Sequence, residues 1–565
     1  MNVIRFFARN AASRLLLAVA VGMVSGLGSM GLLALFTNML KQGSQYSTFT
    51  LACVLIALCL SLPLTGFLSE VTLMRLAQGE LFKLRVQLSN RILRAALRHL
   101  EILGSERLMT AFTDDIPGII NALNLVPVLC INIATAISGF LYMGWLSWRL
   151  LLLVLGFLVL GIFVYQLPSF WGLRFLELAL QESEVLFGHY KHLIEGVKEL
   201  KLHSRRRAVF LSEVLRRTAV SRRKYYLKAF NIFTIVASVG QMLVFIAIGV
   251  MLFSSIAGRP GTAVLTGCVI TLLYITQPLS FFMNALPYLG QADITLQRLN
   301  DLTRKLEEPG VLEIAQYVAT DVGLRCEDLT LKAITYAYQT QNKKEAFTLG
   351  PIDMSLKAGQ LVVLAGGNGS GKTTLAKIIT GLYSADNGEL LLDGQRITDE
   401  NKEFYRQHFS AVFYDFHLFE SLLGLEKPNL DDCAREKLVR LQLSHKVTIQ
   451  DGVFSTTQLS QGQRKRLALL TASLEDRPIY VFDEWAADQD RKFKEFFYRH
   501  LLPDLKAEGK MVLIICHDDH YFDVADRIIK LESGKIVYDG VPAAMSGHQL
   551  YFEAVGFRSE RAPIL

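Results

Sequence analysis

The sequence predicts a two-domain protein, in which an all-α membrane domain of six spans is followed by a soluble α/β domain built around a phosphate-binding loop. Three observations predict this architecture. Long runs with almost no charge fill residues 14–290, whereas residues 300–565 have the mixed composition of a soluble domain. The segment GGNGSGKTT at 366–374 lies between an apolar run and a helical pattern. We place the membrane domain at residues 1–305, a linker at 306–323 and the second domain at 324–565.

Six apolar runs are long enough to cross a membrane. A helix of about 20 residues spans ~30 Å of hydrocarbon, and the runs that reach this length are residues 15–40, 50–74, 121–147, 150–171, 230–257 and 263–286. The first run could be confused with a signal peptide because arginines precede it. It is longer than the roughly 7–15 apolar residues of such a peptide, so we expect it to remain as the first span.

The distribution of Lys and Arg predicts how the spans are oriented. The links between spans 2 and 3 and between spans 4 and 5 are long and rich in both residues, so these links and the two termini are expected in the cytoplasm. This topology accounts for the net charge of +7 without nucleic acid as a partner. Apolar residues recur in the same links at helical spacing, which predicts that spans 2–5 continue into the cytoplasm as helices and turn near residues 101–107 and 194–206.

Few polar residues lie inside the spans. No acidic residue occupies the middle of a span, and Glu70 lies near the cytoplasmic end of the second, so the sequence lacks the membrane-buried relay that is typical of ion-coupled carriers. Gly22 and Gly26 have the spacing of a close helix–helix contact. Four amide side chains either bond a neighbouring helix or contact cargo, namely Asn132, Gln241, Gln277 and Asn284.

The glycine-rich segment has the context that a Walker A motif requires. LVVLAG at 361–366 reads as a strand, and LAKIITGLY after the loop has helical periodicity. Glycines let backbone N–H groups point at a phosphate, and the helix N-terminus adds partial positive charge. We expect Lys372 to reach the β- and γ-phosphates of ATP and Thr373 to hold Mg²⁺. The predicted nucleotide-binding residues of this segment are Gly366, Gly367, Asn368, Gly369, Ser370, Gly371, Lys372, Thr373 and Thr374.

A second motif supplies carboxylates. PIYVFDEW at 478–485 is an apolar strand that ends in two acids, about 110 residues after the Walker A motif. Asp483 fits a Walker B ligand that acts on Mg²⁺, and Glu484 fits a general base that polarises the water attacking the γ-phosphate. Lys372 and Glu484 are the catalytic residues that these two motifs predict.

A third motif identifies the family. LSQGQ at 459–463 resembles the LSGGQ signature of ABC ATPases, with Gln461 in place of the usual glycine, and the whole chain resembles an ABC exporter of the type I fold with its membrane domain fused ahead of its ATPase domain. Ser460 is expected to cap a helix whose N-terminus faces a γ-phosphate. The nucleotide-binding residues that this motif supplies are Ser460, Gly462 and Gln463.

The resemblance assigns roles to further positions. Tyr338 in ITYAY is similar to the aromatic residue that stacks on adenine, and His517 in LIICHDD is similar to the switch histidine that contacts the γ-phosphate. AADQD at 486–490 stands where the D-loop follows Walker B. The Q-loop departs from the family, because FSAVFYDFHLFE places Tyr414 where glutamine is usual. Asp415 either holds Mg²⁺ or its water, or it faces the coupling helices while Tyr414 takes the Q-loop position.

The resemblance also implies an assembly. In this family the signature of one ATPase domain closes the phosphate bound to the Walker A motif of another, and this chain has one of each with six spans. The resemblance therefore implies a homodimer in a bacterial inner membrane. This homodimer would contact membrane lipid and have its ATPase domains in the cytoplasm. ATP binding would close these domains, hydrolysis would part them, and the turns near 101–107 and 194–206 would act as coupling helices.

The subfamily resemblance concerns cargo. LIEGVKELKLHSRRR at 193–207, FSAVFYDFHLFE at 409–420 and FDEWAADQD at 482–490 are similar to bacterial exporters of cyclic peptides and siderophore precursors, including pyoverdine-type exporters. This resemblance implies a small peptide or siderophore precursor as cargo. A lipid or drug exporter of the same architecture is the alternative. A membrane-anchored regulatory ATPase is disfavoured because the catalytic residues are present.

The predicted orientation can be tested by cysteine labelling in a background that lacks the native cysteines. Cysteines introduced within 85–98 and 205–217 should resist an impermeant thiol reagent added to intact cells, because the positive-inside rule places them in the cytoplasm. Cysteines within 42–47 should be labelled. The reverse pattern would contradict the topology.

Overall fold

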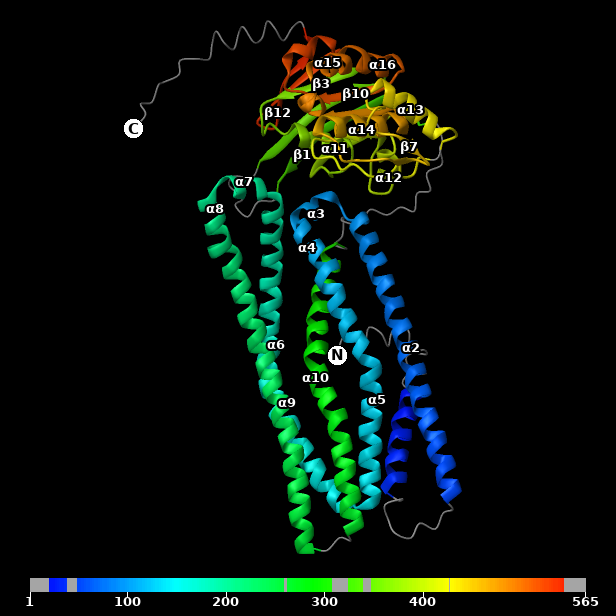
Figure 1. Cartoon of the computed structure of the whole chain (residues 1–565). Helices are drawn as coiled ribbons and strands as arrows, with labels where there is room; N and C mark the ends of the chain where they lie inside the picture. Colours follow the sequence, from blue (N-terminus) through cyan, green and yellow to red (C-terminus); the bar gives the residue numbers. More distant parts are fainter. Residues whose placement is uncertain are drawn as a thin grey trace, which may run out of the picture. The chain divides into compact units, whose positions relative to one another are not determined.

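The computed structural model describes residues 20–37, 48–258, 262–306, 324–338, 347–425 and 427–542. These form two compact units, which are described separately: one reaches to residue 309, and the other starts at residue 310 and also includes Ala96–Arg98 (Figure 1). Loop residues 42–47 and all of the predicted linker except Leu306 lie outside the described residues.

The first unit is a bundle of long helices (Figure 1). Six of its described helices are long and apolar enough to cross a membrane, which confirms the six predicted spans. The first covers Ala20–Thr37. The other five cover Phe49–Arg94, Ser105–Leu146, Trp148–Glu195, Ser204–Phe253 and Val264–Leu306. The elements after the first span are α2 (Thr48–Arg94), α3 (Leu97–Leu103), α4 (Ser105–Thr110), η1 (Ala111–Asp115), α5 (Ile116–Leu146), α6 (Trp148–Glu195), α7 (Val197–Leu202), α8 (Ser204–Val209), η2 (Phe210–Leu215), α9 (Arg216–Gly258) and α10 (Thr262–Leu306).

Several of these helices extend well beyond the membrane thickness. α2 has 47 residues and α6 has 48, and at 1.5 Å per residue such helices are roughly 70 Å long, about twice the hydrocarbon core. The chain reverses where the sequence predicts turns: Gly104, with φ of 77°, separates α3 from α4, and Gly196 separates α6 from α7. The predicted helical extensions are therefore confirmed.

Two residues show how the bundle packs. A Cβ added to Gly26 would lie 2.7 Å from Cβ of Ala134 in α5, so only glycine permits this approach, and the close contact predicted from the glycine spacing is present. The Asn132 side chain donates to the Val128 carbonyl of its own helix at 2.7 Å rather than to a neighbouring helix. Elsewhere α6 packs along α9, and α10 packs along α5.

A buried ion pair lies near residues 101–107. Arg107 donates to Asp115 at 3.0 Å and to the main-chain carbonyl of Arg298 in α10 at 3.3 Å. Asp115 is only 2% exposed. Its burial raises the pKa of the carboxyl group, while the charges of Arg107 and Arg298 oppose that rise. Arg107 lies just after the turn, and its bond to the Arg298 carbonyl connects this part of the chain to α10.

The second unit is an α/β domain with three sheets. A six-stranded sheet has the order β12-β11-β3-β10-β9-β6, and all its neighbouring pairs except β11–β12 are parallel. A four-stranded antiparallel sheet has the order β2-β1-β4-β5. The strands are β1 (Asp328–Ala337), β2 (Thr348–Lys357), β3 (Leu361–Gly366), β4 (Asn387–Leu392), β5 (Gln395–Arg396), β6 (Phe409–Val412), β7 (Ile449–Gln450), β8 (Val453–Phe454), β9 (Ile479–Asp483), β10 (Met511–Ile515), β11 (Arg527–Glu532) and β12 (Lys535–Gly540).

The parallel strands are buried on both faces. Strands β9 and β10 are buried at every residue, as expected where helices or a second sheet cover each face. One apolar cluster includes buried residues of α13 and α14, and a second includes residues of α11 and the antiparallel sheet. The helices of this unit are α11 (Lys372–Ile379), α12 (Lys402–Arg406), α13 (Leu430–Arg440), α14 (Gln461–Glu475), η3 (Trp485–Asp488), α15 (Arg491–Phe496), η4 (Phe497–Leu501), α16 (Leu502–Ala507) and η5 (Asp519–Val524).

Candidate nucleotide site and membrane cavity

Four neighbouring parallel strands deliver the predicted site residues to one edge of the sheet. In the register, Ile515 of β10 is paired with both Leu364 of β3 and Asp483 of β9, so the ends of these strands are level. The Walker A loop follows β3, the carboxylates end β9, and His517 follows β10. Ligands of open parallel sheets bind at the carboxyl ends of strands, and the candidate site lies at this edge.

The Walker A loop folds back on itself around its lysine. The Lys372 ammonium donates to the carbonyls of Gly366 and Gly367, each at 2.9 Å, and Lys372 is 6% exposed. Burial lowers its pKa, while the charges of Glu484 and Asp483 oppose that shift. The side chain is thus held at the mouth of the loop by two main-chain carbonyls.

Gly371 sets the start of α11. It has φ of 101°, and a Cβ there would lie 2.9 Å from the Phe347 ring. Both the backbone conformation and the close approach favour glycine. The turn directs the N-terminus of α11 at the loop, where a phosphate would be stabilised by backbone N–H groups.

A cavity of about 470 Å³ lies in front of the loop. Its volume is within the range for small-molecule sites, and its lining fits a nucleotide because it combines the phosphate loop with the aromatic rings of Tyr338 and Phe347. Tyr338 donates to or accepts from the Thr374 hydroxyl at 3.0 Å, and its ring centroid is 6.4 Å from that of Phe347. The lining residues are Tyr338, Phe347, Asn368, Gly369, Ser370, Gly371, Lys372, Thr373, Thr374 and Glu484.

Asp483 carries a buried carboxylate that suits a metal ion. The residue is 1% exposed, and neither oxygen has a protein hydrogen bond of normal geometry. Burial raises the pKa of this carboxyl group, an effect that the nearby Thr373 hydroxyl reduces and that the charges of Glu484 and Asp415 increase. A buried anion without a partner is costly, and Mg²⁺ prefers carboxylate and hydroxyl oxygens of this kind. Asp483 and Thr373 therefore fit the ion that ATP brings.

Glu484 is held in an uncommon backbone conformation. Its φ of 48° and ψ of 33° are left-handed, which costs on the order of 1–3 kcal/mol for a residue other than glycine. Its N–H donates to the Ile515 carbonyl at 3.1 Å, and its carboxylate oxygen lies 2.9 Å from Nε2 of His517. The structure thus brings the predicted base and the predicted switch histidine into direct contact beside the cavity.

The signature residues lie elsewhere in the chain. Ser460 caps α14 as the sequence predicts: its hydroxyl accepts from the Gln463 N–H at 3.4 Å, and the Gln463 side chain bonds back to the Ser460 N–H at 3.3 Å. A Cβ on Gly462 would lie 2.6 Å from the Asp488 carbonyl. Among the described residues that line the nucleotide cavity, none belongs to this motif.

The Q-loop segment follows β6. Asp415 is exposed, and its charge is among the causes that raise the pKa of Asp483, so it lies near that carboxylate. The ring of Tyr414 lies 5.2 Å from Nζ of Lys465. Its proximity to Asp483 supports the metal role of Asp415, which remains a prediction.

Sequence reasoning missed two contributors. Phe347 lines the nucleotide cavity beside Tyr338, and its only signal is an apolar residue after the polar stretch QNKKEA. Lys465 is fully buried in α14 and contacts the main chain of Glu484 at 2.9 Å. A charge on the otherwise apolar face formed by Lys465, Leu469 and Ala472 was the available signal.

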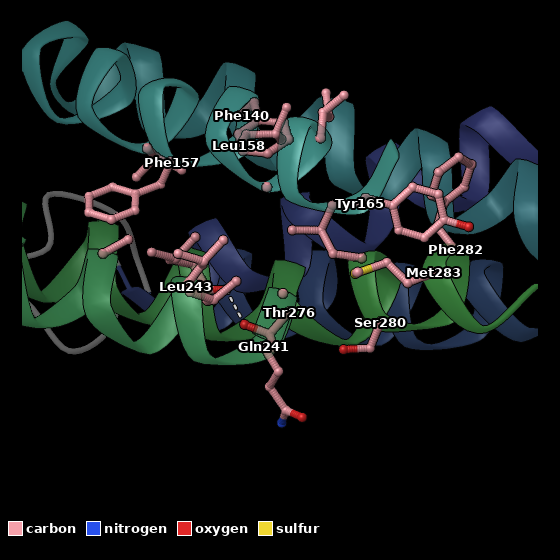
Figure 2. A pocket seen from close by; sticks show the side chains of 18 of the residues that line it. Phe140, Phe157, Leu158, Tyr165, Gln241, Leu243, Thr276, Ser280, Phe282 and Met283 are labelled. Carbon is pink, nitrogen blue, oxygen red and sulfur yellow. Dashed lines mark hydrogen bonds between the residues drawn. The ribbon is translucent and has the colours of Figure 1, made fainter. Parts of the chain in front are cut away.

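The membrane unit contains a cavity of its own, of about 480 Å³, lined by α5, α6, α9 and α10. Figure 2 shows side chains such as Phe157, Leu243 and Met283 around it. Its described lining is largely apolar and includes no charged side chain, while Tyr165, Gln166, Gln241, Thr276 and Ser280 supply polar groups. Gln241, one of the four predicted polar residues, is therefore among the residues that line this cavity.

The comparisons with known proteins agree with both units. Residues 349–487 match the ABC transporter family, and residues 14–278 match the ABC transporter transmembrane region. ATP-binding protein SyrD of Pseudomonas syringae pv. syringae is 37% identical over 542 residues, which cover 93% of this chain and 94% of that relative. The chain belongs to the ABC transporter family. This ABC transporter is an exporter-type, multi-pass membrane protein with a fused domain that binds ATP and couples its hydrolysis to transport.

Other relatives of this ABC transporter are more distant. An ATP-dependent lipid A-core flippase of Vibrio cholerae is 26% identical over 505 residues, which cover 84% of this chain and 83% of the flippase. A solved structure of a bacterial Atm1-family ABC exporter with ATP bound superposes with a TM-score of 0.76, covering 98% of this chain and 99% of that one. At 17% identity this likeness shows the fold alone, and it confirms the predicted fold class.

The buried carboxylate of Asp483 makes a prediction about stability. Its raised pKa means that the folded state is penalised at a pH above that pKa, and the penalty disappears as pH falls through it. Asp483→Asn should therefore raise the melting temperature without nucleotide at neutral pH, by about 2–4 °C if the cost is about 1 kcal/mol. The difference from the wild type should shrink in acid.

Thermal unfolding of the full transporter in detergent would measure this effect, with the exposed Asp399→Asn as the control. Addition of Mg²⁺ and ATP should stabilise the wild type more than the Asp483 variant. A lower melting temperature for Asp483→Asn without nucleotide would show that the carboxylate has a stabilising partner in the folded protein.

The position of Asp415 makes a prediction about metal dependence. If the carboxylate binds Mg²⁺ or its water, Asp415→Ala should raise the Mg²⁺ concentration needed for half-maximal ATPase activity, and Asp415→Gln should partly restore it. Magnesium titrations at saturating ATP would measure both variants. Unchanged magnesium dependence in Asp415→Ala would contradict the metal role and favour a role in coupling.

Proposed function

We propose that this ABC transporter works as a homodimer that exports a small peptide, such as a cyclic peptide or a peptide-siderophore precursor, across a bacterial inner membrane. The observation that carries the proposal is the nucleotide cavity, whose described lining includes the phosphate loop and Glu484, the residue that contacts His517, but includes no signature residue. One chain has six spans and one ATPase domain. A second copy would supply the missing surface at each of two sites.

The residues at the cavity suit hydrolysis of a bound triphosphate. Lys372 would release the loop carbonyls and pair with the phosphates, and Tyr338 would stack on adenine. The Glu484 carboxylate would accept the proton of the attacking water, and His517, which already contacts it, would orient the γ-phosphate. Mg²⁺ held by Thr373 and Asp483 would neutralise charge on the phosphates. These roles match the elements that phosphoryl transfer requires.

The turns of the membrane unit would transmit the ATPase cycle. Each lies between two long helices, near 101–107 and 194–206. The first is fixed to α10 through the bond of Arg107 to the Arg298 carbonyl, while Arg107 also pairs with Asp115 of η1. A displacement of this turn would therefore move α10, which lines the membrane cavity. We propose that both turns act as coupling helices for alternating access.

The membrane cavity supports a cargo with apolar side chains and amide groups. Its aromatic and aliphatic lining would hold apolar parts of a peptide, and Gln166, Gln241 and Ser280 could bond its amides. A lipid with a phosphorylated headgroup would be expected to need cations at its polar end, and the described lining supplies none. This difference favours a peptide over the lipid alternative, and a drug exporter remains the second candidate.

Substitution of the proposed base tests the catalytic part of this function. Glu484→Gln should reduce ATP turnover by about 100-fold or more, because the water loses its base, while ATP binding persists. The variant should accumulate as a closed dimer in ATP, detectable by cross-linking of a single cysteine introduced near Ser460. Near-normal ATPase activity would remove Glu484 from the role.

The same variant serves as the control for transport. Wild-type protein in inside-out vesicles should accumulate an uncharged cyclic peptide in an ATP-dependent manner, and Glu484→Gln vesicles should not. ATP-dependent movement of a fluorescent phospholipid without any peptide uptake would instead support the lipid alternative.

A further inference from the structure

Lys465 is a buried cation at the centre of the ATPase unit. It lies on α14, five residues after the signature serine, and its side chain is fully buried. Its ammonium donates to the main-chain carbonyl of Glu484 at 2.9 Å and pairs with the Asp488 carboxylate at 2.7 Å. The ring of Tyr414 lies 5.2 Å from the same nitrogen. Lysine is almost never fully buried unless it is paired, so these contacts account for its position.

The bond to Glu484 acts on the conformation of that residue. The left-handed backbone of Glu484 directs its carboxylate toward His517. Its N–H is bonded to the Ile515 carbonyl, and its carbonyl accepts from Lys465, so the peptide groups on both sides are fixed. Without the lysine, the carbonyl would lose its charged donor and the strained backbone could relax. The Glu484 carboxylate would then no longer be held toward His517.

Further bonds hold the same segment against α14. The Trp485 indole N–H donates to the main-chain carbonyl of Lys465 at 2.9 Å. The Gln489 side chain donates to the Gly462 carbonyl at 2.9 Å. Residues 484–489 are thus attached to the helix that begins at the signature, and a shift of that helix would be transmitted to Glu484.

We propose that Lys465 is a positioning residue for hydrolysis, which holds Glu484 in its reactive orientation and links it to the signature helix. The proposal rests on the role proposed for Glu484. In the dimer, α14 presents its signature to the nucleotide of the partner while Lys465 on the same helix holds the base at its own nucleotide. Engagement of one nucleotide would thereby set the base at the other.

A double-mutant cycle tests this role in the full transporter. Lys465→Met has similar length without the charge and should lower kcat for ATP about 10- to 100-fold, while KM changes less than about twofold, because a misplaced base slows chemistry and not binding. Addition of Lys465→Met to Glu484→Gln should cause little further loss, since both changes remove the same function. Additive losses would overturn the proposal.

Three further variants complete the test. Lys465→Arg keeps a charge and donors and should recover part of kcat, whereas Lys492→Met, at an exposed lysine of α15, should leave kcat unchanged. If Lys465→Met does not fold, Asp488→Asn takes its place, because Asp488 is 39% exposed in its side chain and its loss removes one anchor of Lys465. Asp488→Asn should lower kcat several-fold, and its loss should not add to that of Glu484→Gln in the double variant. An unchanged kcat would overturn the proposal.

The cycle separates this proposal from the function on which it depends. If Glu484→Gln retains its ATPase activity, the base has been assigned wrongly, and the proposal for Lys465 falls with it. If Glu484→Gln is inactive while Lys465→Met has a normal kcat, only the positioning role of Lys465 is overturned.

Discussion

The parallel pairing of β3, β10, β9 and β6 is the constraint on which the nucleotide site depends. Backbone hydrogen bonds fix the register, so that Leu364, Ile515 and Asp483 lie side by side on neighbouring strands. Four segments far apart in sequence therefore meet at a single edge without long loops. The phosphate loop, the acids, the histidine and the Q-loop segment each need only a few residues beyond a strand to reach the cavity.

Much of this arrangement could be predicted from the sequence, for a physical reason. The Walker A motif needs glycine at positions such as Gly371, where a side chain would clash with Phe347. The capping box formed by Ser460 and Gln463 is likewise a local sequence signal. The spans are visible because hydrocarbon tolerates little polarity. A feature that depends on one local segment can be predicted from the residues of that segment.

Features that depend on distant segments could not be predicted in this way. The apolar neighbours of Lys465 on α14 indicate that it is buried, but only the fold shows that its ammonium meets the carbonyl of residue 484. The membrane cavity is formed by α5, α6, α9 and α10, so no single span indicates it. Likewise, the sequence could not decide whether Asn132 bonds a neighbouring helix or contacts cargo, and the structure shows a bond within its own helix.

The bond between Arg107 and residue 298 has a consequence for how such a protein can diverge. Its acceptor is a main-chain carbonyl, which every amino acid possesses. The side chain at 298 can therefore be exchanged during evolution while this attachment to α10 is retained. A lineage could alter residues along α10, where part of the cavity is lined, while inheriting the same bond between α4 and α10.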